Sequence, residues 1–244
     1  TPEVLRGFYD RHYHSGNCSI FLSGKVTEDT IRRVTDTFGT PFGQYQQKAI
    51  KPEFSFNAVA EKRIFIERED ALQSAVKLGC TTITRQNPDF LKLRVLMTLF
   101  GGYFGSRLMS NIREEKGYTY GISAGIMFYP DIGLLGISTE KDNEYVEPLI
   151  QEVYHEIDKL HQELVPMEEL TMVRNYMLGE MCRSYESAFS LSDAWIFIAT
   201  SGLDDLYFSR SLQAVNEVTP QEIQELAQRY LCKETLKEVI AGKK

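Results

Sequence analysis

The order of expected strands and helices along this chain predicts an α+β fold with a mixed, mainly antiparallel sheet packed against helices. Apolar strand patterns meet across the charged turn at 68–70 and again across Pro130 and Asp131, and short turns of this kind join antiparallel strands. The second half of the chain carries mostly helical patterns, so strands and helices are segregated rather than alternating. We find no second set of strands that would build a separate core, and we therefore expect one domain over residues 1–244.

The N-terminal segment predicts a helix, a strand and a second helix. Thr1 is a suitable cap for a helix that has Pro2 in its first position, and Gly39 is a suitable end for the second helix. The apolar run SIFLS between them predicts a buried strand. The expected elements are a helix to about Tyr13, a strand at Ser19–Ser23, a helix at Thr27–Phe38 and a loop over residues 40–52.

The middle of the chain predicts two strand pairs separated by two helices. Asn87 followed by Pro88 marks a helix start, and Gly117 marks a helix end. The expected strands are Ala58–Glu67, Gln73–Cys80, Tyr120–Phe128 and Gly133–Thr139, and the helices between them are Asn87–Phe100 and Ser106–Lys116. The remainder predicts helices at Tyr145–Leu160 and Met167–Ala188, shorter helices to Leu231 and a closing strand at Leu236–Ala241.

The charge balance disfavours one class of partner. The 244 residues carry 27 Lys and Arg against 34 Asp and Glu, which gives a formal net charge of −7. A nucleic-acid-binding surface needs a concentrated basic patch, and this balance disfavours one. The chain has no run of about 18 apolar residues, the length that a membrane-spanning helix needs. The N-terminus does not resemble a signal peptide and indicates no compartment, and we expect the chain to be part of a longer, multidomain protein.

No complete zinc site can be assembled from the histidine and cysteine pattern. Two zinc-binding histidines on one helix need to lie one turn apart, at i and i+4. In the segment HEIDKLH, His155 and His161 are separated by about 240° around a helix, and Lys159 occupies the i+4 position. The cysteines are far apart without a C-x-x-C pair, which favours buried free thiols. The sequence therefore predicts neither metal ligands nor a Ser or Cys nucleophile motif.

Residues 100–122, FGGYFGSRLMSNIREEKGYTYGI, contain a glycine-rich connection. Gly101, Gly102 and Gly105 lie between two expected helices, whereas phosphate-binding loops lie between a strand and a helix. No Lys-Ser or Lys-Thr follows at the required spacing either, so the Walker and Rossmann interpretations fail. The structural interpretation is a tight helix–helix connection that needs small residues.

Arg113 and Tyr120 are the candidate site residues in the same stretch. Gly117 breaks the helix between them, so their side chains can converge across a turn. A guanidinium and a phenol both donate hydrogen bonds, which suits a peptide carbonyl, a carboxylate or a developing oxyanion. A structural alternative stays open, in which Tyr120 is a core residue beside Ile122 and Ala124 and Arg113 forms a surface ion pair with a neighbouring glutamate.

The stretch resembles the signature of the second domain type of M16 zinc metallopeptidases, the group of pitrilysin and mitochondrial processing peptidase. That signature joins a glycine-containing loop, a Ser-Arg-Leu helix and the pattern Arg-Glu-x-x-Gly-x-x-Tyr. Here the helix motif is Ser106–Leu108 and the pattern is Arg113–Tyr120. The opening helix and strand and the final ETLKEVIAGK also resemble this family, so the resemblance covers essentially the whole chain.

The resemblance implies the M16 (LuxS-like metallohydrolase) fold and a function divided between two halves. One half carries a His-x-x-Glu-His zinc helix, and the other closes the chamber and supplies an arginine and a tyrosine to the peptide substrate. By motif position these are Arg113 and Tyr120, with Gly101, Gly102 and Gly105 more weakly linked to substrate handling. The resemblance thus implies a non-catalytic domain that binds no cofactor itself, with zinc on a partner domain or subunit in the same chain or a separate one.

Two alternatives to this function remain open. One is a structural M16-like scaffold without catalytic contribution, and the other is a self-contained hydrolase with an unrecognised site. Arg113 and Tyr120 opening together onto a concave face would favour the substrate-binding role. A buried Tyr120 with Arg113 turned to solvent would favour the scaffold.

Overall fold

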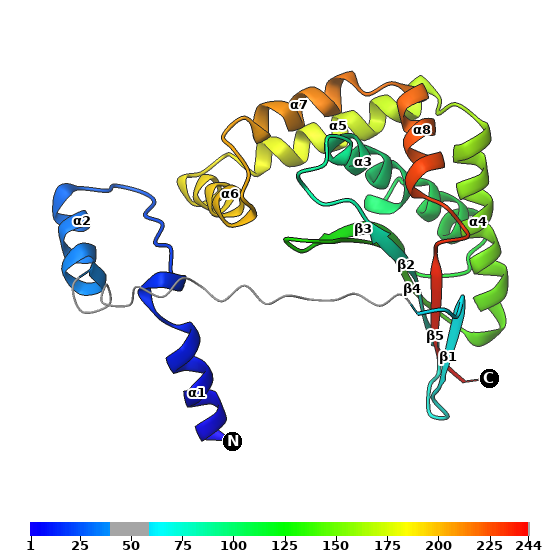
Figure 1. Ribbon diagram of the computed structural model, residues 1–244. Coiled ribbons are helices and arrows are strands. Elements are labelled where there is room, and N and C mark those ends of the chain that lie inside the picture. Colours follow the sequence, from blue (N-terminus) through cyan, green and yellow to red (C-terminus); the bar gives the residue numbers. More distant parts are fainter. Residues whose placement is uncertain (40–58, 244) are drawn as a thin grey trace. The chain divides into compact units, whose positions relative to one another are not determined.

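The computed structural model describes residues 1–39 and 59–243 (Figure 1). The loop predicted over residues 40–52 and the first residue of a predicted strand, Ala58, lie outside the described residues. Contacts between residues divide the chain into two compact units. Unit 1 comprises Thr1–Ala58 and Ser184–Phe197, and unit 2 comprises Val59–Arg183 and Ile198–Lys244. One domain over residues 1–244 stays a prediction.

Unit 2 is built on a five-stranded sheet. Its strands are β1 (Arg63–Glu67), β2 (Ser74–Thr82), β3 (Ile122–Phe128), β4 (Gly133–Lys141) and β5 (Lys237–Gly242). They lie in the order β1-β5-β2-β4-β3 (Figure 1). β1 pairs with β5 in parallel, whereas β5–β2, β2–β4 and β4–β3 are antiparallel. The predicted α+β class with a mixed, mainly antiparallel sheet is confirmed, and so is the hairpin across Pro130 and Asp131.

The first two strands of the sheet are not neighbours, contrary to the hairpin expected across the turn at 68–70. β5 lies between them, with Val239 opposite Ile64 of β1 and opposite Lys77 of β2. The physical reason lies in the strand sequences. β5 buries Ile240 and Glu238, so it suits a position with a neighbour on each side, whereas β1 is mostly exposed and has charged residues at both ends, which suits an edge.

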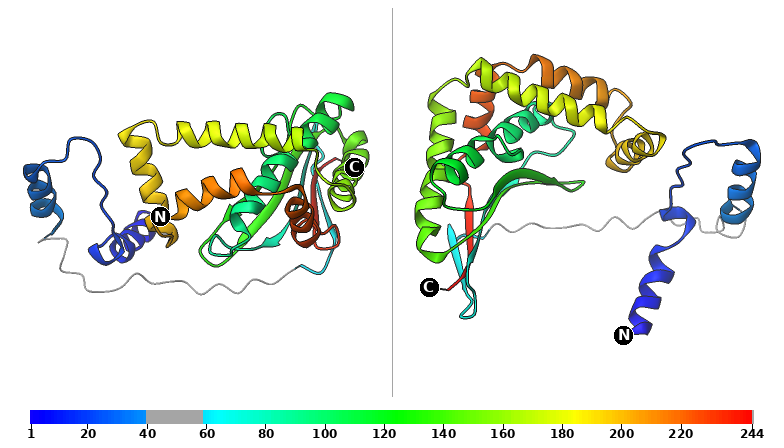
Figure 2. Two further views of the ribbon diagram at one scale, coloured as in Figure 1. Left: turned by 90° about the horizontal axis from the view of Figure 1, so that it is seen from above. Right: turned by 180° about the vertical axis from the view of Figure 1, so that it is seen from behind.

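Helices lie on one side of this sheet (Figure 1). They are α3 (Phe90–Met97), α4 (Val146–Gln162), α5 (Met167–Arg183), α7 (Tyr207–Glu217) and α8 (Pro220–Tyr230), with α6 (Ala188–Ser201) divided between the units. Figures 1 and 2 show α3, α4 and α8 beside the sheet and α5 beside α7. Among the described helices, none combines the length and the apolar character needed to cross a bilayer. The helix predicted to reach Ala188 ends at Arg183.

The two faces of the sheet differ in character. The face towards the helices contributes Val76 and Leu78 of β2 and Ile137 of β4 to the apolar core, together with Leu93 and Ile157 from helices. On the other face Lys77, Ser138 and Ser123 are exposed and lie in register across β2, β4 and β3. The period of two along each strand therefore produces one core face and one polar face.

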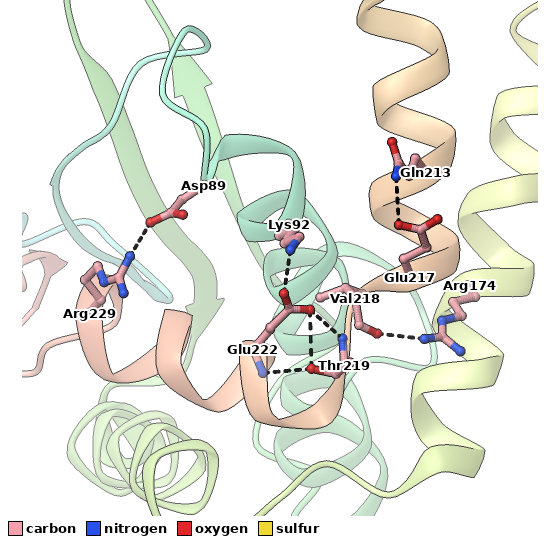
Figure 3. Close-up of polar contacts among 9 residues, drawn as sticks. All are labelled: Asp89, Lys92, Arg174, Gln213, Glu217, Val218, Thr219, Glu222 and Arg229. Atoms are coloured by element: carbon pink, nitrogen blue, oxygen red, sulfur yellow. Dashed lines mark hydrogen bonds and ion pairs between the residues drawn. The ribbon is translucent and has the colours of Figure 1, made fainter.

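Helix α8 begins with a capping box and is attached to the start of α3 by ion pairs (Figure 3). Thr219 Oγ1 accepts the N–H of Glu222 at 3.2 Å, and Glu222 Oε2 accepts the N–H of Thr219 at 2.9 Å, which is a reciprocal capping box. Lys92 Nζ donates to Glu222 Oε1 at 2.5 Å, and Arg229 pairs with Asp89. These contacts position the strand β5 that follows α8.

Within the described residues 1–39, unit 1 contains the α-helices α1 (Pro2–His12) and α2 (Glu28–Val34), and the first part of α6 also belongs to this unit. Thr27 Oγ1 accepts the N–H of Thr30 at 3.2 Å, which confirms the cap predicted for the second helix. Ser19–Ser23 is not a strand, and its Ile20 and Leu22 are exposed, so the buried strand expected there is wrong for this chain. A strand needs a neighbour to satisfy its backbone groups, and the described strands all belong to the sheet of unit 2.

Candidate functional site

The candidate site lies where a short helix of unit 2 ends and β3 begins. The helix, η4 (Met109–Glu115), has the wide turns of a π-helix. Two residues beyond its last residue lies Gly117, whose φ of +65° is left-handed. The N–H of Gly117 donates to the carbonyl of Arg113 at 3.2 Å, and that of Tyr118 donates to the carbonyl of Ile112 at 2.9 Å. The helix end predicted at Gly117 is therefore confirmed, and it satisfies the last carbonyls of η4.

Arg113 lies on the last turn of η4 and is partly covered by two neighbours. Its Cζ is 4.5 Å from the ring centroid of Phe104, a cation–π contact. Its Nη1 is 3.2 Å from Glu114 Oε1, yet this buried nitrogen makes no hydrogen bond within the described part of the chain. The side chain is 31% exposed. Part of the Arg113 side chain is therefore open to solvent, whereas the nitrogen that makes no hydrogen bond is itself buried beside Glu114.

Tyr120 lies just before β3 and not within it. The strand begins at Ile122, and the Tyr120 side chain is 92% exposed. The preceding residue, Thr119, is buried instead. Its Oγ1 donates to the carbonyl of Glu140 at 2.9 Å and accepts the N–H of Gly121 at 3.2 Å. Burying Thr119 turns the next side chain outward, so the alternative of a core tyrosine at Tyr120 is wrong.

A pocket of about 380 Å³ lies beside Tyr120. Its lining is mostly polar, and the amide of Gln73, one of the lining residues, donates to Asp142 Oδ1 at 3.1 Å. Arg113 does not line this pocket. Its lining residues are Gln73, Thr119, Tyr120, Gly121, Ser138, Thr139 and Glu140. Convergence of Arg113 and Tyr120 on one substrate stays a prediction.

Polar contacts that the sequence did not single out hold η4 against α4 and α5. Asn111 Nδ2 donates to Glu156 Oε1 at 2.7 Å and to Glu152 Oε2 at 3.0 Å, and both Asn111 and Glu156 are buried. Arg107 makes a two-pronged contact with Glu169, at 2.7 and 2.8 Å. Burial opposes the charge of Arg107, but the hydrogen bonds and charge of Glu169 outweigh it and raise the pKa of Arg107.

The carboxylate of Glu169 corrects one sequence interpretation. Adjacent carboxylates such as Glu168 and Glu169 on a helix are typical of a solvated face, and Glu168 is exposed, but the side chain of Glu169 is largely buried against Arg107. The Ser-Arg-Leu motif drew attention to Arg107. Its partner is remote in the sequence, and no local pattern identifies which of many glutamates will reach it.

The three glycines before η4 have different surroundings. A Cβ at Gly101 would lie 2.6 Å from the Cβ of Ala124 in β3, so only glycine permits this close packing. A Cβ at Gly105 would lie 2.9 Å from the ring of Tyr103, and one at Gly102 would lie 3.2 Å from the carbonyl of Met97. These distances support the tight connection expected from the sequence, and the role of the glycines in substrate handling stays a prediction.

The histidines on α4 do not form part of a metal-binding group. His161 Nε2 lies 3.0 Å from the carbonyl of Ala227, and His155 is exposed. Within residues 1–39 and 59–243, no three His, Cys, Asp or Glu side chains are placed so that they would hold a metal ion. Arg113 and Tyr120 themselves carry N–H and O–H groups that can donate hydrogen bonds to an oxygen of a ligand.

Comparison with known families gives a match over most of the chain. Residues 1–177 match the family profile described as the peptidase M16 inactive domain. A relative from Rickettsia felis, named an uncharacterized zinc protease, is 26% identical over 187 residues, which are 76% of this chain and 44% of that protein. The chain spans about half the length of the curated relatives it matches.

Solved structures share the fold. The peptidase M16 inactive domain from Pseudomonas fluorescens matches with a TM-score of 0.86 and 21% identity, over 100% of this chain and 58% of that chain. A protease from Helicobacter pylori matches with a TM-score of 0.87 and 16% identity, over 99% of this chain and 59% of that chain. The fold that the motif resemblance implied is thereby confirmed.

Proposed function

The chain belongs to the peptidase M16 inactive-domain family, and on this premise we propose that it is the non-catalytic, substrate-binding and chamber-closing half of a zinc peptidase. Zinc is bound by a partner domain or subunit that carries a His-x-x-Glu-His helix. The relatives named as zinc proteases are about twice as long as the matched region, which leaves room for such a half in those proteins.

The observation that carries the substrate-binding role is the exposure of Tyr120. A phenol that is 92% exposed beside a polar pocket is open to a ligand and gains little from packing. Arg113 adds a partly exposed guanidinium shortly before Tyr120 in the chain. In the proposed role the two side chains donate to carbonyl oxygens of the peptide, and their hydrogen bonds strengthen where negative charge develops on such an oxygen.

The first prediction tests these donors in the complete peptidase. Arg113→Ala and Tyr120→Phe should each lower kcat/KM for a peptide by roughly 10²-fold, because each removes one donor to a developing charge. The measurement is steady-state hydrolysis by the chain combined with its zinc-bearing half. Tyr129→Phe is the matched control, since Tyr129 is also an exposed tyrosine beside β3 and is absent from the pocket.

Full activity of both variants would contradict the proposed role. A scaffold domain is the second candidate, and the ion pair of Arg113 with the neighbouring Glu114, at 3.2 Å, favours it. In a scaffold, the two substitutions should leave kcat/KM unchanged while the complex with the partner still forms. Peptide hydrolysis by the chain alone would instead indicate a self-contained hydrolase.

A further inference from the structure

Two segments of the chain share a sequence pattern at constant spacing. Thr1–Lys25 and Thr219–Lys243 both begin with Thr-Pro and end with Gly-Lys, and an ungapped alignment joins the two ends. Apolar positions also coincide along this alignment. The matched residues are Leu5 with Ile223, Phe8 with Leu226, Tyr13 with Leu231, Phe21 with Val239 and Leu22 with Ile240, and Arg11 matches Arg229.

The two segments also have the same local structure. Helices α1 and α8 each have 11 residues, begin at matching positions and have proline first. Backbone hydrogen bonds recur at matching positions through the helix and the following turn. In the first turn, the N–H of Leu5 donates to the carbonyl of Thr1 (3.2 Å) and that of Ile223 to Thr219 (3.0 Å). At the helix end, the N–H of Tyr13 donates to the carbonyl of Tyr9 and that of Leu231 to Ala227, both at 2.9 Å. In the following turn, the N–H of Asn17 donates to the carbonyl of His14 (2.9 Å) and that of Thr235 to Cys232 (3.1 Å).

The segments differ in what covers them. In unit 2 the apolar positions are buried: Ile223, Leu226, Leu231 and Ile240 are 0%, 4%, 0% and 2% exposed. The matching positions in unit 1 are open: Leu5, Phe8, Tyr13 and Leu22 are 71%, 50%, 62% and 42% exposed. The apolar positions that build the core in one copy are therefore uncovered in the other, and several exposed apolar side chains on one segment indicate an interaction surface.

The residues that end each segment show the same contrast. After α8 and its turn, Lys237–Gly242 enters the sheet as β5, parallel to β1 and antiparallel to β2. The matching residues, 19–24, are not paired with any described strand. The equivalent place in unit 2 is already filled by β5, so unit 2 of the same molecule has no position for a second copy of this strand.

We infer that Thr1–Lys25 is the closing helix and strand of a second α+β unit with the fold of unit 2. The second unit has a sheet with an open position between one parallel and one antiparallel strand, and residues 19–24 fill that position. It also has an apolar helix layer, against which Leu5, Phe8 and Tyr13 pack. The chain spans about half the length of its curated relatives, so those proteins have residues for such a unit. This boundary differs from the single domain over 1–244 expected from the sequence.

The inference shares with the proposed function only the existence of a second half. It does not depend on zinc, on Arg113 or on Tyr120, and its readout is amide protection rather than peptide hydrolysis. A failure of the one therefore leaves the other standing.

Hydrogen exchange on the full-length gene product and on chain 1–244 tests the inference. Amides of residues 19–23 should exchange roughly 100-fold more slowly in the full-length product than in chain 1–244, and should there approach the protection of residues 237–241, because sheet pairing removes them from solvent. Equal, fast exchange in both proteins would overturn the inference. Slow exchange in monomeric chain 1–244, or protection that appears only as this chain dimerises, would overturn it too.

Two substitutions in α1 provide a matched comparison. Leu5→Asp places a charge where Ile223 is buried in unit 2, and should abolish the protection of residues 19–23 in the full-length product. Gly7→Asp introduces the same charge where the matching Glu225 is exposed and no atom lies within 4 Å of the new Cβ, and should leave protection unchanged. Because Leu5 is exposed in chain 1–244, neither variant should alter the thermal unfolding of that chain. Equal effects of the two variants on protection would contradict the inference.

Discussion

At the scale of single residues, the surroundings of Gly117, Thr119 and Tyr120 decide what the candidate site offers. Gly117 was recognisable as a helix stop because a left-handed residue favours glycine. The outward orientation of Tyr120 was not recognisable, because alternation from Ile122 and Ala124 extends naturally back to Tyr120. The hydrogen bonds of Thr119 break that alternation, and they involve Glu140, which lies on the neighbouring strand.

Gly117→Ala tests the turn that separates Arg113 from Tyr120. The substitution should lower the free energy of unfolding by about 1–2 kcal/mol, because a left-handed conformation crowds a Cβ against the following carbonyl. Urea unfolding followed by circular dichroism measures it. Gly125→Ala is the control, since Gly125 has no positive φ and no atom within 4 Å of a new Cβ. Equal losses in the two variants would contradict the role of the left-handed turn.

At the scale of secondary-structure elements, local sequence signals predicted where an element lies and whether it is a helix or a strand. They predicted less well which strands lie next to each other in the sheet. The hairpin of β3 and β4 followed from a short turn, and its register places Ile122 opposite Thr139. The position of β5 between β1 and β2 did not follow, because residues from the two ends of unit 2 meet there. Asn87, predicted as a helix cap, instead accepts the N–H of Asp89 at 2.9 Å in a turn before α3.

Glu222→Gln tests how α8 is attached. The hydrogen bond from Lys92, followed by that from the N–H of Thr219, lowers the pKa of Glu222. A lowered pKa means that the ionised carboxylate stabilises the folded chain above the ordinary glutamate value of about 4.3, and that this contribution is lost as pH falls through the lower, folded-state pKa. The variant should lose about 0.5–1 kcal/mol at pH 7, where the Lys92 ion pair is intact.

The pH dependence supplies the check on that attachment. Urea unfolding at pH 7 and again well below pH 4.3 should show the difference between wild type and Glu222→Gln shrinking as the wild-type carboxylate takes up a proton. Glu225→Gln changes an exposed glutamate on the same helix and should be neutral at both pH values. A difference that persists at acid pH would show that α8 loses something other than the ion pair.

At the scale of the whole molecule, the chain presents two units with unequal cores. The apolar core cluster is made of residues of unit 2, whereas α1 of unit 1 buries none of its residues. This asymmetry, the family match and the half-length coverage of relatives together support a chain that functions beside a second unit.

The zinc content of chain 1–244 tests whether zinc belongs to the partner and not to this chain. Chain 1–244 should retain less than about one zinc ion per ten chains after dialysis, because a stable zinc site needs three or four converging protein ligands. Elemental analysis of the dialysed chain measures it, with the zinc-bearing half as the positive control. One ion per chain that survives dialysis would contradict the assignment of zinc to the partner.

The sequence by itself determined the fold class, most helices, the β3–β4 hairpin and the Gly117 stop, because caps, turns and short-range periodicity are local properties of the chain. The Arg-Glu-x-x-Gly-x-x-Tyr pattern determined the family. Tertiary structure alone decided the central position of β5, the burial of Glu169 against Arg107 and the exposure of Tyr120. Each of these depends on which distant segment fills a neighbouring position. Ser19–Ser23 has the sequence pattern of a strand but does not form one here, because no described strand lies beside it to satisfy its backbone groups.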